Sequence, residues 1–376
     1  MKFQILNVNN KKDFNRFIDF PYQLYKDNPY WVPVPKISVK ELLDKEKNPF
    51  YKHADAELFL AVDENNNVIG RIAAIRNDLH NLHHKDKTGF FGFFECIDNQ
   101  EVANALFDVA KDWLKKKGFR VMRGPVNPST NDEIGFLLEG FDDSPRIMMT
   151  YTFPYYLTLA ENYGMKKAKD LYAYQLESLN QTDFDRITKL VESIKKRYNI
   201  TIRNINLKNF AEELENFKYV YNKAWEKNWG FVPLTDEEID YMAKNLKPLI
   251  DPEWVIFIEA DGKLAGAALT LPDYNYWFKK ANGNILKFIY YLIFKKKVLA
   301  KESNWIRVVT LGLLPEYRGK GFDSVMYTYY IHKALEVGNR YGEASWLLED
   351  NEMINRGMQL LNGKLYKKYR LYEIEI

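Results

Sequence analysis

One segment of the sequence has the residue types and the order of an anion-binding site. A β-branched and aliphatic stretch, residues 305–313, runs through a proline turn into an Arg-Gly-Lys-Gly sequence at 318–321, which opens an amphipathic helix. Backbone N–H groups in such a turn point the same way, the helix dipole adds partial positive charge, and glycine lets a phosphate approach closely. Arg318 and Lys320 would add charge attraction. The alternative is an ordinary strand-to-helix turn with solvated cations.

A second candidate site is an acidic loop in the first half of the chain. Residues 127–145 are rich in carboxylates and form an unusually long connection, and long loops inside compact domains are often functional. We expect Asn127, Asp132 and Glu133 to contact the substrate, because carboxylates can bind a cationic amine or deprotonate it. The alternative is a solvated surface loop.

A third segment is both cationic and apolar. Residues 279–301 contain seven lysines and no acidic residue, and the ten residues 285–294 inside it are almost wholly apolar. Ten residues cannot cross about 30 Å of hydrocarbon, but an interfacial helix with lysines at both ends can lie on an anionic leaflet. The alternative is a helix that packs on the protein's own sheet while its lysines reach outward.

The elements that position these residues follow the same order in both halves of the chain. Each half has a predicted hairpin around an Asn-rich or Gly-containing turn, followed by a strand, a long helix and a further strand. The first 55 residues are predicted to be irregular. The predicted strands are 57–62, 68–75, 89–97, 119–122, 255–259, 264–269, 305–313 and 344–348, and the predicted helices are 100–117, 183–198, 209–227 and 323–341.

A weak internal repeat supports two domains. Residues 118–127 occupy the same place in the first half as residues 342–351 in the second, since each stretch follows a long helix, runs as a strand and ends on asparagine. We therefore predict an α+β fold with two tandem domains, residues 1–179 and 180–376. Each is expected to be a mixed, mostly antiparallel sheet flanked by helices.

The strand, turn and helix around residue 320 resemble the acetyl-CoA signature of the GNAT superfamily of N-acyltransferases. In that signature a strand ends in a Pro-x-x-Arg-Gly-x-Gly-x-Gly/Ala turn, and Pro315, Arg318, Gly319 and Gly321 match it with the spacing intact. The resemblance implies that backbone amides of the turn hold the pyrophosphate of an acetyl-CoA or longer acyl-CoA co-substrate. It also implies that the strand hydrogen-bonds pantetheine, while residues 346–348 separate from it to admit the thioester. The cofactor-binding residues expected on this basis are Thr310, Leu311, Gly312, Leu313, Arg318, Gly319, Lys320, Gly321, Phe322, Asp323 and Asn351.

Two positions depart from the family pattern. Asp323 stands where the family has Gly or Ala, and a carboxylate there repels a pyrophosphate by about a kcal/mol unless it points away as a helix N-cap. The family also draws a general acid from a tyrosine on its last helix, where this chain has Met358 or Gln359. Tyr327, Tyr330 or water would then have to protonate the leaving thiolate.

In a direct transfer from an acyl thioester to a neutral amine, a carboxylate or a water chain takes the proton of the amine. Glu349 and Asp350 are the candidates, because they end the strand beside the implied thioester; the alternative is that they cap the helix that starts near Glu352. At the matching place in the first half, residues 95–101 contain no glycine and are net negative, so this half is predicted to be a GNAT-like scaffold without a CoA loop that helps to form the acceptor site.

Over nearly its full length the chain resembles a bacterial family of tandem GNAT proteins that includes the bacterial ceramide synthases. The resemblance rests on residues 30–33, 48–50, 124–127 and 349–351. It implies an acyl-CoA-dependent N-acyltransferase whose acceptor is an amine, either small and polar or a sphingoid-type lipid amine. The lysine-rich apolar segment favours the lipid.

Two other functions stay open. Asp323 and the missing tyrosine favour a non-catalytic GNAT-like binding or regulatory module. A tRNA-dependent aminoacyl transferase of the Fem type also uses tandem GNAT-like domains, but it needs a broad basic face. The net charge of +3, from 54 basic and 51 acidic residues, argues against that function and against a nucleic-acid partner in general.

The remaining composition predicts a cytoplasmic location. Cys96 is the single cysteine, which excludes an intrachain disulfide and fits a reducing compartment. The N-terminus lacks the apolar core of a signal peptide, and no apolar run reaches the roughly 18 residues of a membrane-spanning helix. We expect a cytoplasmic protein that touches the inner face of the membrane if its acceptor is a lipid. No metal is expected, because the five histidines have no matching cysteine or second cluster.

Overall fold

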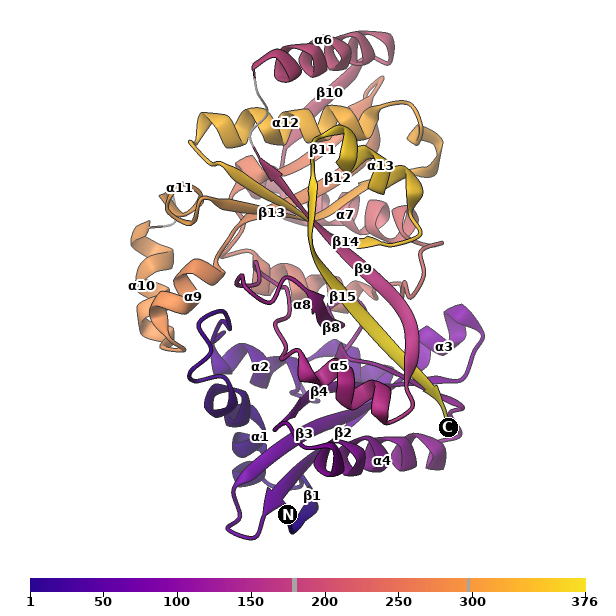
Figure 1. The fold of residues 1–376 in the computed structure, drawn as a ribbon. Helices are drawn as coiled ribbons and strands as arrows, with labels where there is room; N and C mark the ends of the chain where they lie inside the picture. The colour runs from indigo at the N-terminus through magenta and orange to yellow at the C-terminus, as the bar shows by residue number, and fades with distance from the viewer. Residues whose placement is uncertain (178–180, 296–297) are drawn as a thin grey trace. The chain divides into compact units, whose positions relative to one another are not determined.

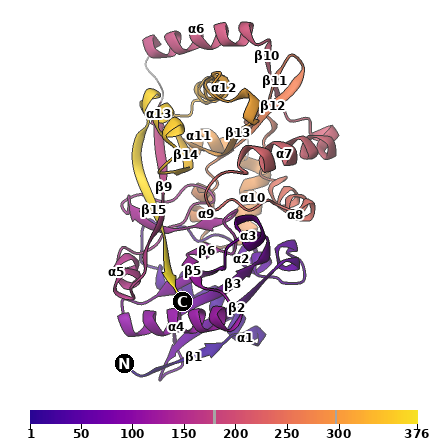
Figure 2. The ribbon, with the colours of Figure 1, turned by 90° about the vertical axis from the view of Figure 1, so that its right-hand side faces the viewer.

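The computed structural model of the protein describes residues 1–177, 181–295 and 298–376. The chain forms two compact units, unit 1 and unit 2 (Figures 1 and 2). The predicted domain boundary, between residues 179 and 180, lies outside the described residues, as do two lysines of the cationic segment, Lys296 and Lys297.

Unit 1 consists of Met1–Tyr172, Phe278–Ile285 and Lys367–Ile376. The last segment belongs to strand β15, which we expected to lie wholly in the second domain. The elements of unit 1 in chain order are β1 (Phe3–Asn7), α1 (Lys11–Leu24), α2 (Lys36–Leu42), η1 (Pro49–Lys52), β2 (Ala54–Asp63), β3 (Val68–Asn77), α3 (Asp78–His84), β4 (Thr88–Cys96), α4 (Gln100–Lys116), β5 (Val121–Gly124), β6 (Val126–Asn127), β7 (Glu133–Ile134), β8 (Phe136–Glu139), α5 (Tyr155–Asn162), the first part of β9 (Lys166–Glu177) and most of β15 (Lys364–Glu375).

The N-terminal 55 residues are helical over much of their length, so the expectation of irregular structure is wrong. Asn10 caps α1 by accepting a hydrogen bond from the Asp13 N–H, and the helix buries Phe17, Ile18 and Phe20. The prolines at 33 and 35 dominated the sequence pattern, because proline favours extended chain around it. Helix α1 lies upstream of them.

The sheet of unit 1 has the strand order β1-β2-β3-β4-β5-β15. All neighbours are antiparallel except β4 and β5, which are parallel. Side chains alternate between the two faces of a strand. On β3, Ile72 and Ala74 therefore pack in the core with Leu106 and Phe107 of α4, whereas the guanidinium of Arg71 lies 4.9 Å from the Phe17 ring of α1.

Unit 2 consists of Ala173–Trp277 and Leu286–Tyr366. Helices α9 and α10 and strands β9 and β15 each have residues in both units. The elements are α6 (Gln181–Arg197), β10 (Ile200–Asn204), η2 (Leu207–Asn209), α7 (Phe210–Ala224), α8 (Asp236–Leu246), η3 (Pro252–Trp254), β11 (Val255–Ala260), β12 (Lys263–Pro272), α9 (Asn275–Ala281), α10 (Ile285–Lys295), α11 (Leu299–Ser303), β13 (Trp305–Leu313), η5 (Pro315–Tyr317), α12 (Phe322–Glu336), β14 (Tyr341–Leu348) and α13 (Glu352–Leu360).

The sheet of unit 2 repeats the design of unit 1. Its strand order is β14-β13-β12-β11-β10, and β13 and β14 are the parallel pair. Phe322, Val325 and Met326 of α12 form the core of one face with Val191 of α6. Helix α7 covers the other face, where Trp225 packs against Gly312. The prediction of an α+β fold, with mixed, mostly antiparallel sheets flanked by helices, is confirmed.

Candidate functional site

Strand β13 carries a bulge where the resemblance implies that pantetheine binds. In the antiparallel pairing of β13 with β12, Thr310 is opposite Leu269 and Val308 is opposite Thr270. Val309, between them, therefore has no partner in the ladder. A bulge bends a strand and re-aims the groups beside it. The Oγ1 atom of Thr310 is buried, and no hydrogen-bond partner for it exists among the described residues. A buried hydroxyl without a partner is uncommon in folded proteins, which marks this position as a candidate contact.

Strands β13 and β14 pair over only part of their length. The parallel register ends at Val308↔Ala344, whereas β13 continues to Leu313 and β14 to Leu348. We call the unpaired lengths, residues 309–313 and 345–348, the V of unit 2. Past this point the two strands no longer pair with each other, although the Ser345 carbonyl accepts a hydrogen bond from Arg307 Nη2 at 3.1 Å. Backbone groups further along, at residues 310–313 and 346–348, can therefore face an inserted ligand.

The turn after β13 leaves a row of amides exposed at the start of α12. Gly319 and Gly321 have φ values of +69° and +83°, and Gly321 is the N-cap of the helix, with no side-chain capping bond. Positive φ is easy only for glycine. The amides of residues 319–323 make no hydrogen bond within the described parts of the chain. Such a cluster at a helix N-terminus binds phosphate.

The side chains of the turn serve a different purpose from the one expected. Arg318 donates to the carbonyl of Leu313 at 3.2 Å and to that of Ala224 at 2.5 Å, so its guanidinium fixes the turn to the ends of β13 and α7. The Lys320 ammonium is exposed and lies 5.8 Å from the Tyr317 ring. Lys320 is thus the cation of this turn that can still approach an anion.

Most other residues expected at the cofactor can offer only their backbone. The side chains of Leu311, Leu313 and Phe322 pack in the core of unit 2. Gly312 lies under Trp225, because a Cβ added to it would stand 2.5 Å from the indole. Main-chain N–H and C=O groups are therefore what these positions present to a ligand.

Asp323 is not the N-cap of α12. Only in that role was its carboxylate expected to point away from a phosphate. Gly321 occupies the cap position, and Asp323 lies in the first turn of α12. Burial raises the pKa of Tyr327, one turn further on, and the Asp323 carboxylate raises it further. The Tyr327 hydroxyl therefore stays protonated at neutral pH.

The turn after β14 is organised by two asparagines. The Asn351 side chain accepts from the Ile354 N–H and caps α13, so its amide is committed to the helix. The Asn355 amide donates to the carbonyls of Leu348 and Glu349. Glu349 is half-buried and Asp350 exposed. Asn351 is thus the N-cap residue of α13.

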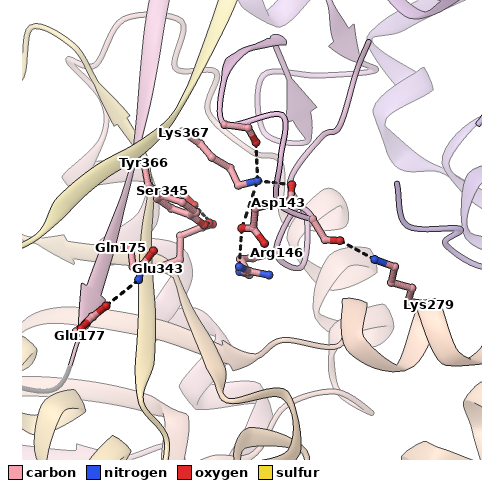
Figure 3. Close-up of polar contacts among 11 residues, drawn as sticks. Asp143, Arg146, Gln175, Glu177, Lys279, Glu343, Ser345, Tyr366 and Lys367 are labelled. Carbon is pink, nitrogen blue, oxygen red and sulfur yellow. Dashed lines mark hydrogen bonds and ion pairs between the residues drawn. The ribbon is translucent and has the colours of Figure 1, made fainter. Parts of the chain in front are cut away.

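A buried ionic network stands at the apex of the V, and sequence reasoning missed it. Arg307 and Glu343 face each other in the β13–β14 register, at 3% and 0% exposure, with Arg307 Nε 3.5 Å from Glu343 Oε1. The Ser345 hydroxyl donates to Glu343 at 2.6 Å and accepts from Arg307 Nε at 2.9 Å. The Tyr366 hydroxyl donates to the other Glu343 oxygen, as Figure 3 shows. The only signal in the sequence is polar residues at alternate positions of an otherwise apolar strand.

The corresponding V of unit 1 is closed by the chain itself. The register of β4 with β5 ends at Phe90↔Arg123. The Asn127 side chain then accepts a hydrogen bond from the Phe93 N–H, and a Cβ on Gly92 would lie 1.8 Å from the Val126 carbonyl oxygen. The backbone edge that would meet pantetheine is therefore occupied.

The other two residues expected to bind substrate lie close to Asn127. Glu133 pairs with Asn127 in the small β6–β7 ladder. Burial raises the pKa of the Tyr51 hydroxyl, and the nearby Asp132 carboxylate raises it further. The three residues thus gather in one part of unit 1.

Further along, basic side chains hold the acidic loop. Lys367 donates to the carbonyls of Gly140 and Asp143, at 3.2 and 2.6 Å, and Lys279 donates to Ser144 Oγ at 2.9 Å (Figure 3). The Asp143 carboxylate pairs with Arg146 at 2.7 Å. These contacts anchor the loop to its own unit.

Over residues 1–177, 181–295 and 298–376, no group of three or more His, Cys, Asp and Glu side chains is arranged to hold a metal ion. In the same residues, no helix combines the length and apolarity that crossing a bilayer demands.

Comparison with known proteins yields relatives over almost the whole chain. No protein-family model matches. Protein YghO of Escherichia coli K12 is 33% identical over 372 residues, which cover 98% of this chain and 94% of that protein. The bacterial ceramide synthase of Caulobacter vibrioides is 32% identical over 379 residues, covering 98% and 96%. Among solved structures, a tandem GNAT protein from the clavulanic acid biosynthesis pathway matches with a TM-score of 0.57 at 10% identity, over 100% of this chain and 98% of that one.

Proposed function

This chain belongs to the tandem GNAT N-acyltransferase family, and we propose that it transfers an acyl group from acyl-CoA to the amino group of a long-chain, sphingoid-type lipid. The observation that carries the proposal is the combination of the V and the amide row of α12 in one unit. The pantetheine arm and thioester of acyl-CoA need a gap between two strands. The pyrophosphate of the same molecule needs an anion-binding site beyond the end of one of those strands.

The residues present fit acyl-CoA. The amides of residues 319–323 would hold the pyrophosphate, with Lys320 adding a positive charge. Backbone groups of residues 310–313 would meet the pantetheine arm, and the unpartnered Thr310 hydroxyl supplies a further polar group there. Asp323 opposes the pyrophosphate by about a kcal/mol, which the amide row and Lys320 offset.

The chemistry is a direct transfer. The neutral amine nitrogen attacks the thioester carbonyl carbon, a C–N bond forms, and the C–S bond breaks. The amine gives up a proton to a base, for which Glu349 and Asp350 are the candidates. The departing CoA thiolate takes a proton from an acid, for which Tyr327 is the candidate because it lies on α12, one turn beyond the amide row.

A lipid acceptor is supported by two observations. The Caulobacter relative is named a ceramide synthase and aligns over nearly the whole chain. Helix α10 also exposes large apolar side chains beside lysines, which suits a protein that meets its substrate at a membrane. Asn127, Asp132 and Glu133 remain the proposed contacts to the amine. With such an acceptor, the proposed site of action is the cytoplasmic face of the inner membrane.

The competing function is a GNAT-like module that binds without turnover. Asp323 in the first turn of α12 favours it, as does Met358, buried on α13 where the family has its catalytic tyrosine. Such a module would bind CoA weakly or would bind it and form no product.

Thermal-shift titration with acetyl-CoA and palmitoyl-CoA tests the proposal. A ligand at a hundred times its dissociation constant stabilises the folded state by about 2.7 kcal/mol, which raises the melting temperature measurably. We expect both to bind and palmitoyl-CoA to bind more tightly. Mass spectrometry should then find an amide formed from palmitoyl-CoA and a long-chain amino alcohol, but little from a short polyamine. Binding without product would favour the module, and no shift with either ligand would contradict the acyl-CoA site.

A matched pair of variants sharpens the test. Gly319→Asp puts a carboxylate in the amide row at a position where a Cβ meets nothing within 4 Å. Gly262→Asp makes the same change in the β11–β12 turn, where φ is +71° and the space is equally open. Gly319→Asp should lose CoA binding and Gly262→Asp should keep it. Gly321→Asp is less clean, because its Cβ would lie 2.7 Å from Ile194 Cδ1.

A further inference from the structure

Helix α10 is apolar on both sides, yet only one side is covered. Phe288 is buried at 7% exposure and meets the Tyr274 ring edge-on at 6.4 Å, and Tyr291 stacks on Trp277 at 5.8 Å. These contacts fix the inner face of the helix on the residues around α9. A helix that is hydrophobic all round is normally buried.

The outer face of α10 forms an exposed apolar stripe. Its members recur at helical spacing, and six of the sixteen exposed large apolar side chains of the described residues lie on this one helix. A contiguous exposed apolar surface marks an interaction site, whereas single exposed side chains are ordinary. The stripe consists of Leu286, Ile289, Tyr290, Ile293 and Phe294, with Ile285 beside it.

The surroundings of the stripe identify what covers it. From residue 274 to residue 301 the sequence has no acidic side chain. Lys280 and Lys287 lie near the start of the helix and Lys295 at its end, and all three are exposed. A partner protein would be expected to meet an apolar stripe with a mixed rim, whereas an anionic bilayer offers an apolar interior beneath a negative surface.

The dimensions fit a helix that lies in the plane of the bilayer. Eleven residues make a helix of about 16 Å, too short for the roughly 30 Å hydrocarbon core. A stripe along one side can instead enter the boundary between headgroups and acyl chains while lysines contact the phosphates.

We propose that the α10 stripe docks the protein on an anionic phospholipid bilayer, inserting Leu286, Ile289, Tyr290, Ile293 and Phe294 below the headgroups. The inference rests on the proposed function in one respect, because docking would bring the enzyme to a lipid amine that resides in the membrane. It names the surface, its orientation and the lipid charge that the surface requires.

Vesicle co-sedimentation of the full chain tests the docking. The probes are vesicles of phosphatidylcholine alone and vesicles that also contain phosphatidylglycerol. Wild type should bind the anionic vesicles, and added salt should weaken binding because it screens the lysines. The double variant Leu286→Glu/Ile293→Glu should bind at least about tenfold more weakly, because carboxylates resist transfer into the headgroup boundary.

The matched control changes two apolar residues of similar exposure away from α10. Leu82 and Tyr219 are 75% and 53% exposed, against 74% and 65% for Leu286 and Ile293. Leu82→Glu/Tyr219→Glu should sediment with anionic vesicles as wild type does. Melting temperatures of both double variants, measured without vesicles, should stay close to that of wild type.

Three results would overturn the proposal: no binding of wild type to anionic vesicles, unchanged binding of the α10 variant, or a vesicle-free dimer that the α10 variant dissociates. The last result would assign the stripe to a second copy of the chain. Titration of wild type with palmitoyl-CoA in the absence of vesicles separates this failure from that of the proposed function. Binding of CoA without binding of vesicles would reject the docking alone.

Discussion

The side-chain oxygen of Asn127 accepts a hydrogen bond from the backbone N–H of Phe93 at 2.6 Å. This bond lies just past the last paired residues of β4 and β5, at the place in unit 1 that corresponds to the V of unit 2. In the sequence repeat, Asn127 matches Asn351, whose side chain instead caps α13. One asparagine thus fills a strand edge while its counterpart leaves the edge open.

We therefore expect one acyl-CoA per chain. Isothermal titration with palmitoyl-CoA should give a stoichiometry of one. In unit 1 the gap between β4 and β5 is filled by Asn127 and Val126, and residues 95–101 before α4 contain no glycine. Asn127→Ala removes one hydrogen bond and should lower the free energy of unfolding by about 1 kcal/mol. It should not create a second site, because the Val126 carbonyl still blocks the strand at Gly92. Two equivalents of bound ligand in wild type would contradict this account of unit 1.

Tyr327→Phe should slow the acyl-transfer step without weakening CoA binding. General acid catalysis contributes a factor of about a hundred or more, so kcat should fall by at least that much while the dissociation constant of CoA is unchanged. The raised pKa of the Tyr327 hydroxyl keeps it protonated, so in wild type this group causes no loss of kcat at mildly alkaline pH. Pre-steady-state and steady-state kinetics give both quantities.

Tyr329→Phe is the control for that variant. Tyr329 lies two residues after Tyr327 on α12. Its hydroxyl accepts a hydrogen bond from the Asn204 amide and donates one to the Glu253 carbonyl, so it is not a candidate for the proton donor. If Tyr327→Phe behaves like Tyr329→Phe in kcat, the proton comes from another group or from water.

Glu343→Ala should destabilise unit 2 strongly. The substitution leaves the Arg307 guanidinium, which is 3% exposed, without its carboxylate partner. Removing one partner of a buried ion pair costs about 3–5 kcal/mol of stability. Chemical denaturation measures the loss. Glu352→Ala removes a carboxylate from an exposed pair with Arg356 and should change stability by less than about 1 kcal/mol. Equal effects of the two variants would show that Glu343 is not part of a buried pair.

His80 should make stability fall on mild acidification. Burial lowers its pKa to about 4, with Asp86 opposing and His84 adding to the shift. The unfolded chain, with a histidine pKa near 6.5, binds more protons between those two values, so the free energy of unfolding falls as pH drops from about 6.5 to about 4. Chemical denaturation at several pH values between about 4 and 6.5 gives the slope of the free energy of unfolding against pH. This slope should be shallower for His80→Phe than for wild type, and the substituted phenylalanine keeps an aromatic ring against Phe90.

The same slope in wild type and His80→Phe would mean that other groups govern the acid sensitivity.

The parts of the fold that follow from local pattern could be predicted. Hairpins, the strand 305–313 and the helix after Gly321 have strong periodicity and turn chemistry, and they form as expected. Helix α1 was missed because nearby prolines outweighed its amphipathic spacing. The sequence left open whether Asp323 caps α12, because aspartate is a favoured N-cap; in the structure Gly321 takes that position with φ of +83°.

The buried network could not be predicted because it depends on register. Arg307 and Glu343 are polar residues in apolar strands, and alternation tells only which face each occupies. That they meet is decided by the parallel pairing of β13 with β14, which no local pattern encodes. The closure of the V in unit 1 has the same origin, since the contact of Asn127 with Phe93 spans 34 residues.

Strand β15 has a consequence for how the protein can be made and cut. The sheet of unit 1 ends on a strand drawn from Lys367–Ile376, which pairs with β5 through residues such as Tyr372 and Gly124. During synthesis β5 must wait for almost the whole remaining chain before its partner emerges. A fragment that stops near residue 179 keeps the residues of a domain but leaves the edge of β5 bare, a template for aggregation. The two halves of this sequence repeat are thus not two independently folding pieces, and unit 1 reaches completion last.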